Sequence, residues 1–437
     1  MSWSRSGTLL IDGWEDELRR SLYGTAAARV DEPTIVMGLH DVTGNRGNAS
    51  KVRICMSATL LEAADIVMAE MGIEDARCFL AAVTDNPNVM KAFRKMLETK
   101  YCWLITLACW VHQLNTLIGE ICRYAAAKAA FGKANYVVTF FNGSHYWGGQ
   151  LKIAALAEEI TRGLKKDCAS RWYALILLLC STKDVKDGLV VLLMKAIDSL
   201  SAINLDVVRI IQDSENTSWP MVKQGIHIAQ PFVDAIAQCE GRAVTLADCM
   251  LNLLGAARQL LLLKDEQEND AAFKKHAYDV VDKRFRQMAT PIHCLALFLN
   301  PLCRRFAVSC KCRCTLVVEA AGFRLRDLKT TALGIAKSKW NWSKLECQLL
   351  AKDIDEYAGC REPFSGGQKD AREWWKVLPV APELHTLKPF ALAILSIVPH
   401  AAEIERRFSS CNGIQSPKRN SLAVSTFSKL AKIRSRL

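Results

Sequence analysis

The sequence lacks any apolar stretch long enough to cross a lipid bilayer. Its longest uncharged apolar runs, residues 173–180 and 188–194, are much shorter than the roughly 20 residues that a membrane-spanning helix needs. The first five residues also lack the apolar segment of a secretory signal peptide. No repeat of fixed period and no low-complexity tract is present. We therefore expect a folded, soluble protein that does not associate with membranes and is not secreted by the signal-peptide route.

Acidic residues are in deficit. The chain has 57 Lys and Arg against 45 Asp and Glu, a formal net charge of +12. This excess favours an anionic partner, usually nucleic acid, although a basic protein without a particular partner would have the same composition. The 17 cysteines, without an export signal, predict reduced thiols in a reducing compartment. At 437 residues and 50% apolar, the chain has room for two or three domains.

The first part of the chain alternates strand-like runs with amphipathic helices. The pattern predicts three strands and a helix at residues 6–11, 21–30, 33–39 and 49–71, then strand, helix and strand at residues 80–83, 88–99 and 103–108. Beyond residue 173 the periodicity is helical for a long way. The tail from residue 417 has six basic residues and no acidic one, together with apolar residues at helical spacing.

Asp85 and Cys109 fall at the ends of two predicted strands that a helix connects. Such a strand–helix–strand unit predicts parallel strands, and ligands gather at the carboxyl ends of strands in open α/β sheets. For Asp85 alone, a turn-capping role is the more common explanation.

Four separated motifs in this sequence resemble, in the same order, those of hAT-superfamily DNA transposases. They are T-D-N at 84–86, C-x-x-H-x-L-N at 109–115, R-W at 171–172 and E-R-x-F-S at 405–409. Any one of them would be a weak signal, but four in order are specific. The resemblance covers nearly the whole chain from Asp12 onward.

The resemblance implies an α/β fold. It would be an RNase H-like mixed sheet interrupted by a large all-helical insertion, with a helical C-terminal dimerisation segment. We expect residues 1–172 to form the first part of the RNase H-like domain and residues 173–385 the helical insertion. Residues 386–437 would then hold the last catalytic helix and the dimerisation region.

The resemblance also implies metal-dependent cleavage and transfer of DNA strands. Asp12, Asp85 and Glu405 are the carboxylates at the positions of the family's acidic triad, so we expect them to be catalytic metal ligands. Mg²⁺ or Mn²⁺ would be the cofactor, because hard oxygen ligands match hard divalent cations. Glu403 lies two residues from Glu405, but the register of the E-R-x-F-S motif favours Glu405.

DNA contacts are expected at Trp14, Arg171, Trp172, Lys418 and Arg419. A tryptophan beside the cleavage site offers a surface on which an exposed base stacks, and the basic residues suit phosphates. Two core tryptophans and a solvated basic surface are the alternatives.

Cys109 and His112, spaced i and i+3, could supply half of a zinc site, but no second pair has matching spacing. We expect a structural role for both. Cys310, Cys312 and Cys314 lack a C-x-x-C partner and are interpreted as thiols on a basic segment.

No zinc-finger arrangement of cysteines and histidines precedes Asp12, whereas full transposases of this family usually carry one. The alternative function is therefore a catalytically inactive or domesticated derivative that acts through dimerisation and DNA binding. Both hypotheses imply DNA as a partner, a homodimer or higher homo-oligomer formed through the C-terminal region, and a nuclear location.

Overall fold

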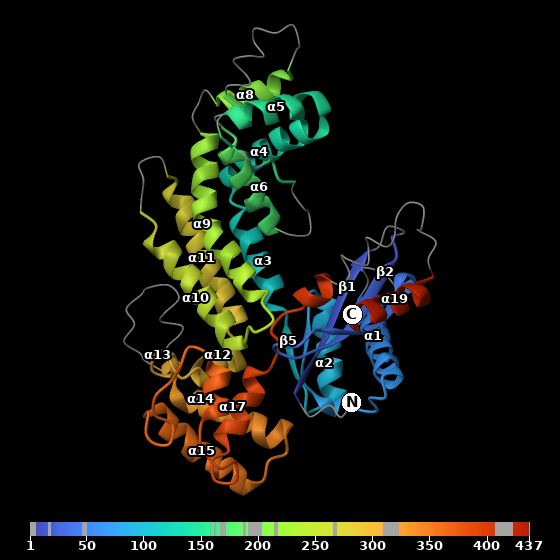
Figure 1. The fold of residues 1–437 in the computed structure, drawn as a ribbon, viewed down its shortest axis with the longest axis vertical. Helices are drawn as coiled ribbons and strands as arrows, with labels where there is room; N and C mark the ends of the chain where they lie inside the picture. The colour runs from blue at the N-terminus through green and yellow to red at the C-terminus, as the bar shows by residue number, and fades with distance from the viewer. Residues whose placement is uncertain are drawn as a thin grey trace. The chain divides into compact units, whose positions relative to one another are not determined.

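The structure is a computed structural model that describes residues 6–15, 19–45, 50–157, 159–160, 163–166, 172–186, 189–190, 203–213, 217–264, 269–308, 323–406 and 423–436. The chain forms two compact units (Figure 1). Unit 1 consists of Met1–Gln113, Ala237–Asn252 and Arg286–Leu437, and unit 2 of Leu114–Ile236 and Leu253–Phe285.

Unit 1 contains a five-stranded mixed sheet. Its strands are β1 (Gly7–Glu15), β2 (Ser21–Ala28), β3 (Ile35–Asp41), β4 (Phe79–Thr84) and β5 (Ile105–Ala108). Their order across the sheet is β3-β2-β1-β4-β5. Strands β1 and β3 each run antiparallel to β2, whereas β4 runs parallel to β1 and β5 parallel to β4. The α/β class and the predicted element order are confirmed.

Two helices pack together along one face of this sheet, α1 (Ser50–Glu70) and α2 (Asn88–Lys100) (Figure 1). Leu9 and Ile11 of β1 share a buried core with Val67 of α1 and Phe93 of α2. Because successive side chains of a strand point to opposite faces, the intervening residues of β1 face away from these helices.

The remainder of the described chain is largely helical. Helix α3 (Trp110–Ile121) begins in unit 1 and ends in unit 2. The helices that lie wholly or mainly in unit 2 are α4 (Ala125–Gly143), α5 (His145–Ala157), α6 (Trp172–Asp184), α8 (Leu205–Gln212), α9 (Ser218–Cys239), α10 (Leu246–Leu262) and α11 (Ala271–Met288). None of the described helices combines the length and apolarity that crossing a membrane requires.

Unit 1 carries further helices after residue 286. They are α12 (Pro291–Leu299), α13 (Arg304–Val308), α14 (Leu325–Gly334), a π-helical turn (Ile335–Lys339), α15 (Lys344–Ala358), α16 (Ala371–Val377), α17 (Leu387–Leu395), a short helix at residues 402–406, and α19 (Val424–Arg436). The described residues of 286–385 belong to the same unit as the sheet, and those of 114–172 belong to unit 2. Helical periodicity gives the buried face of a helix but not the body against which that face packs.

Helix α19 packs against the edge strand β3 of its own chain. Its buried side chains, Phe427 and Ala431, are four residues apart and so lie on one helix face. Ser428 accepts a hydrogen bond from the Leu39 amide of β3 at 3.3 Å. An exposed strand edge can pair with another chain, so covering β3 protects this part of the sheet.

Replacing Phe427 by alanine should release α19. Phe427 is fully buried, and truncation of such a side chain costs about 3–5 kcal/mol, which is large for one helix held by one face. We expect hydrogen exchange of the β3 amides to accelerate. Thr426→Ala, at an exposed position of the same helix, is the control. If hydrogen exchange of the β3 amides were unchanged in Phe427→Ala, burial of Phe427 would not be what holds α19 on β3.

Candidate functional site

Asp12 and Asp85 lie side by side in the register of the sheet. The parallel pairing of β1 and β4 aligns Ile11 with Thr84, so Asp12 and Asp85 occupy the next pair of positions along the two strands. Asp12 is 7% exposed. By strand alternation it shares the face of Thr8, which is the face away from α1 and α2. The two carboxylates that the sequence separates by 73 positions (85 − 12) thus come from adjacent strands.

Arg94 of α2 fixes the turn that carries Asp85. Its guanidinium donates to the Thr84 hydroxyl at 2.6 Å, to the Asp85 carbonyl at 2.6 Å and to the Asn86 side-chain oxygen at 2.7 Å. The T-D-N sequence therefore supplies three acceptors to one planar donor group. None of these three bonds uses the Asp85 carboxylate, so the turn is held without consuming that group.

The surroundings of the Asp85 side chain disfavour its charged form. Its Oδ1 is buried without a hydrogen-bond partner. Burial raises the pKa of Asp85 to about 6, although nearby His112 and Arg94 oppose the rise, and Glu405 adds to it. The influence of Glu405 places this distant residue within electrostatic range of Asp85.

Cys109 is buried at the start of α3, between the predicted acidic residues. Its sulfur accepts the amide hydrogen of His112, three residues on, which is the geometry of a helix N-cap, and that of Ala401 at 3.4 Å. This gives Cys109 a backbone-capping role at the start of α3. Burial raises the pKa of the Cys109 thiol to about 12, and Glu405 and Asp12 both contribute to the rise.

Backbone hydrogen bonds attach the segment that precedes Glu405 to the sheet. The Val398 amide donates to the Thr8 hydroxyl of β1 at 3.0 Å, and the Trp110 amide donates to the Pro399 carbonyl at 3.0 Å. Glu405 lies on the short helix that follows and is half-buried. The sequence predicts a helix over residues 391–411 with Pro399 as a kink or start point, and the chain is not helical at residues 398–401, where it contacts β1 and α3.

Asp12 and Asp85 lie at neighbouring positions of adjacent strands, and Glu405 interacts electrostatically with Asp85 and with Cys109. Their ligand oxygens are not all within 4.8 Å of one another, since among the described residues only one other group meets that criterion. This spacing is wider than one small ion needs. A site with two ions, which lie about 3.5–4 Å apart, distributes its carboxylates more widely.

The residues predicted to contact DNA are only partly described. Arg171, Lys418 and Arg419 lie outside the described residues, and Trp14 is on β1 with its side chain not described. Trp172 is half-buried in unit 2. A Cβ on Gly119 would lie 2.5 Å from its ring, so the ring packs directly on the α3 backbone, and Arg123 lies 6.0 Å from the ring centre. These contacts match the core alternative for Trp172.

A second group of side chains in unit 1 could hold a metal ion. The ligand atoms of Asp353, Glu356 and His385 all lie within 4.8 Å of one another. Asp353 is 1% exposed, and its two oxygens already accept hydrogen bonds from His385 Nδ1 at 2.9 Å and from the Leu387 amide, at the start of α17, at 3.1 Å. In the sequence this group gives only a weak signal, because it consists of an Asp and a Glu spaced i and i+3 on a helix and a histidine 29 positions after the Glu (385 − 356).

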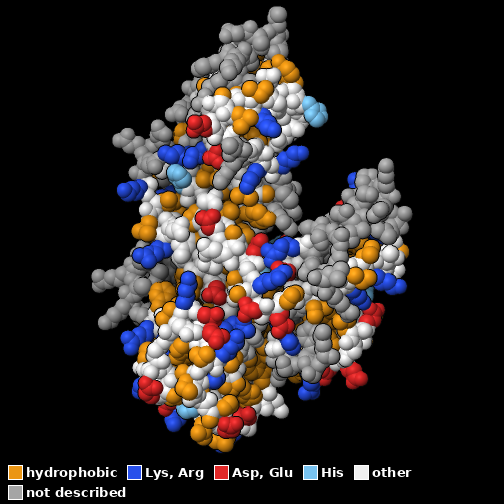
Figure 2. All heavy atoms as spheres, viewed as in Figure 1, with side chains coloured by type: hydrophobic (Ala, Val, Ile, Leu, Met, Phe, Trp, Pro, Cys, Tyr) orange, Lys and Arg blue, Asp and Glu red, His pale blue; other side chains and the backbone are white. Residues whose placement is uncertain are grey.

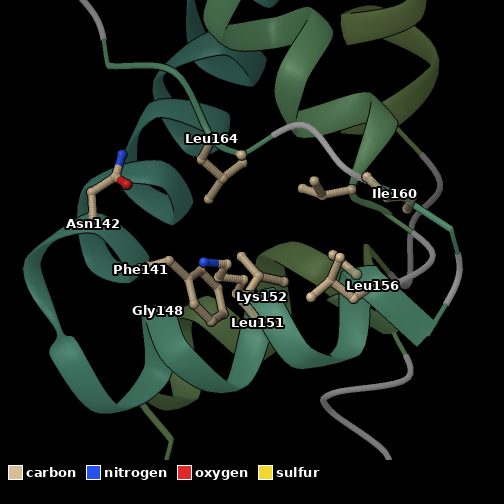
Figure 3. Close-up of a pocket in the computed structure, with 11 residues that line it drawn as sticks. Phe141, Asn142, Gly148, Leu151, Lys152, Leu156, Ile160 and Leu164 are labelled. Atoms are coloured by element: carbon tan, nitrogen blue, oxygen red, sulfur yellow. The ribbon is translucent and has the colours of Figure 1, made fainter.

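One face of the molecule and one cavity in unit 2 show no sign of a further site among the described residues. On the face drawn in Figure 2, the basic side chains of the described residues are mixed with acidic ones and form no continuous stripe. Figure 3 shows a cavity of about 260 Å³ in unit 2 whose labelled polar side chains are Asn142 and Lys152. Among the residues that line it, none is a carboxylate or a histidine, so this cavity lacks metal ligands and acid–base groups.

Comparison of the sequence with models of known protein families and with curated proteins finds no match.

Asp85→Asn should stabilise the metal-free protein at neutral pH. The pKa of Asp85 in the folded protein, about 6, lies above its ordinary value of 3.8. Between pH 3.8 and about pH 6, Asp85 therefore keeps its proton in the folded state and loses it in the unfolded state. Stability therefore falls as pH rises through this window. The variant should be more stable than the wild type by about 2 kcal/mol at pH 8, and by almost nothing at pH 4. Urea unfolding without divalent ions measures this, with the exposed Asp206→Asn as control.

Asp353→Ala should lower the free energy of unfolding by about 2–3 kcal/mol, because His385 and the Leu387 amide both lose their buried acceptor. Glu356→Gln should cost much less, since none of these hydrogen bonds involves it. Equal losses in both variants, together with stabilisation of the wild type by added Zn²⁺, would instead indicate that a bound ion holds the group.

Proposed function

We propose that this chain is a metal-dependent DNA-cleaving and strand-transferring enzyme of the hAT transposase type, built on an RNase H-like sheet. The observation that carries the proposal is the position of Asp12 on β1 beside Asp85, the residue that follows β4, with Glu405 in electrostatic range of Asp85. Three carboxylates brought close together from distant parts of a chain are costly to stability unless they serve a ligand.

The order of the sheet supports the fold assignment. Three antiparallel strands, a helix and a parallel strand–helix–strand unit follow one another along the chain, and β1 lies next to β4. The RNase H-like fold needs this adjacency, because its first two acidic residues lie on the first strand and at the end of the fourth.

The residues present fit a divalent metal. The buried Asp85 Oδ1 has no hydrogen-bond partner, and a cation would offset both that deficit and the electrostatic cost of neighbouring carboxylates. Asp12, Asp85 and Glu405 would hold Mg²⁺ or Mn²⁺. The metal would activate the attacking water or hydroxyl and relieve charge on the phosphate.

The chain's own groups orient these ligands. Arg94 fixes the backbone of Asp85 while leaving its carboxylate available. The Cys109 sulfur ties the start of α3 to the segment before Glu405, so the helix that carries Glu405 begins at a fixed point beside β1. Orientation of this kind lowers the cost of assembling the transition state.

The alternative function is an inactive or domesticated derivative that binds DNA and dimerises without cutting. The wide spacing of the three carboxylates favours it, since their ligand oxygens do not form a compact group. For either function we propose DNA as the partner, self-association and a nuclear location.

Purified full-length chain should nick or hairpin DNA in the presence of Mg²⁺ or Mn²⁺. Asp85→Ala and Glu405→Ala should each reduce the rate by about 100-fold or more, because loss of a metal ligand should cost at least as much as loss of a group that only orients one. Glu383→Ala removes an exposed carboxylate of unit 1 and should retain the wild-type rate. Equal activity in the wild type and Asp85→Ala would exclude the enzyme, and metal-independent DNA binding alone would favour the derivative.

A further inference from the structure

The loop between α9 and α10, residues 240–245, belongs to unit 1 together with the ends of both helices. It contacts the segment that carries Glu405 at three places. No motif pointed to this loop, and none of its residues is among the predicted site residues.

The first contact joins the loop backbone to a buried histidine. His400 is 1% exposed, and its Nδ1 accepts the Ala402 amide hydrogen at 3.3 Å. Its Nε2 therefore carries the proton and donates it to the Gly241 carbonyl at 3.2 Å. Both ring nitrogens are used, so the imidazole fixes the distance between the loop and the start of the short helix.

The second contact is an ion pair to Glu403, which is 8% exposed. Arg242 donates through Nε to Oε1 at 3.1 Å and through a terminal nitrogen to Oε2 at 3.5 Å, and Arg406 donates to Oε1 at 2.8 Å. Burial alone would raise the pKa of Glu403, but the hydrogen bond from Arg242 and the charge of Arg406 lower it. Glu403 is thus held as an anion between two arginines.

The third contact ties Arg406 to the loop. Its guanidinium donates to the Glu240 carbonyl at 3.0 Å and lies 3.5 Å from the Glu240 carboxylate. The loop is itself anchored to the sheet, because the Arg242 carbonyl accepts the amide hydrogen of Asp31, beyond the end of β2, at 3.2 Å. Arg242 therefore connects the short helix, through Glu403, to the segment that follows β2.

We call these three contacts of the loop at residues 240–245 the clamp. Helix geometry determines the direction in which the clamp holds Glu405. At about 100° per residue, Glu403 and Arg406 share the face that the loop holds, and Glu405 projects roughly 130° away from the middle of that face. The clamped face turns Glu405 away from the loop. The segment before this helix is hydrogen-bonded to Thr8, whose side chain lies on the same face of β1 as Asp12, so the helix begins on the face that carries Asp12.

We propose that Arg242 is a positioning residue: through Glu403 and Arg406 it sets the rotation of the short helix, and hence the position of Glu405 in the metal site. This inference rests on the proposed function. Half of the Arg242 side chain is exposed, so we expect the ion pair to act mainly by orienting the short helix and to contribute little to stability.

A double-mutant cycle on the full-length chain tests the proposal, with Arg242→Ala, Glu403→Gln and the double variant. Mn²⁺ binding is measured by titration without DNA, and the melting temperature is measured in parallel. We expect each single variant to weaken Mn²⁺ binding about 10-fold, and the double variant to bind no more weakly than the worse single one, because both changes break the same link. Arg242→Lys should be intermediate, since a lysine cannot reproduce the two-nitrogen contact.

Arg209→Ala is the matched control. Arg209 also pairs with a carboxylate, Asp206 at 3.1 Å, but this exposed pair lies in unit 2. It should leave Mn²⁺ binding unchanged. If Arg242→Ala only destabilised the fold, its melting temperature would fall while its affinity for Mn²⁺ stayed equal to that of Arg209→Ala.

Hydrogen exchange of the Glu405 amide, which donates to the Ala401 carbonyl at 3.1 Å, gives a readout that does not need the metal. Exchange should accelerate in Arg242→Ala and not in Arg209→Ala. Unchanged exchange, or faster exchange with unchanged Mn²⁺ affinity, overturns the positioning role. Faster exchange in a chain whose wild type binds no Mn²⁺ would leave the clamp in place and refute the proposed metal site.

Discussion

The parallel register between β1 and β4 is the constraint on which the candidate site depends. Aligning Ile11 with Thr84 places Asp12 beside Asp85, and a slip of one residue would turn one of them toward the helix-covered face. The irregularity between Gly7 and Thr8 occurs before this alignment, so the last pairs of the ladder are regular. Leu9 and Ile11 bury their side chains under α1 and α2, and this burial holds the register. The core on one face thus determines which polar groups meet on the other.

A second constraint delivers a residue from the far end of the sequence. Thr8 and Val398 are 390 positions apart, yet they are joined by a buried hydrogen bond. Closing so long a loop is entropically unfavourable, but the cost grows only logarithmically with length. It is offset here by several contacts made by a short stretch of chain, including a sulfur that accepts an amide hydrogen and a histidine with both nitrogens bonded. Glu405 follows this stretch directly, so the hydrogen bonds of the stretch determine where the backbone of Glu405 lies.

Much of the sheet could be predicted from the sequence, and much of the packing could not. Apolar alternation located the five strands, and the period of Phe93 and Leu97 located α2, because these patterns report a buried face. The glycine-rich aromatic segment 141–149 predicts a loop or turn, but apart from Ser144 it forms the end of α4 and the start of α5, where burial of Leu151 outweighs glycine's low helix propensity. The roles of Arg242 and His385 were missed because each depends on a partner more than 30 residues away. Pattern analysis detects periodicity within one element, whereas such pairs exist only once separate elements have docked.

The docking of α19 on β3 has a consequence for how the protein is made. Leu39 and Ser428, which join the two elements, are 389 residues apart. During synthesis β3 therefore leaves the ribosome long before the helix that covers it, and its edge stays open while most of the chain is translated. An open strand edge recruits other nascent or misfolded chains. The interval between the two elements is thus a period of vulnerability to aggregation, and slower translation of the intervening helices would lengthen it.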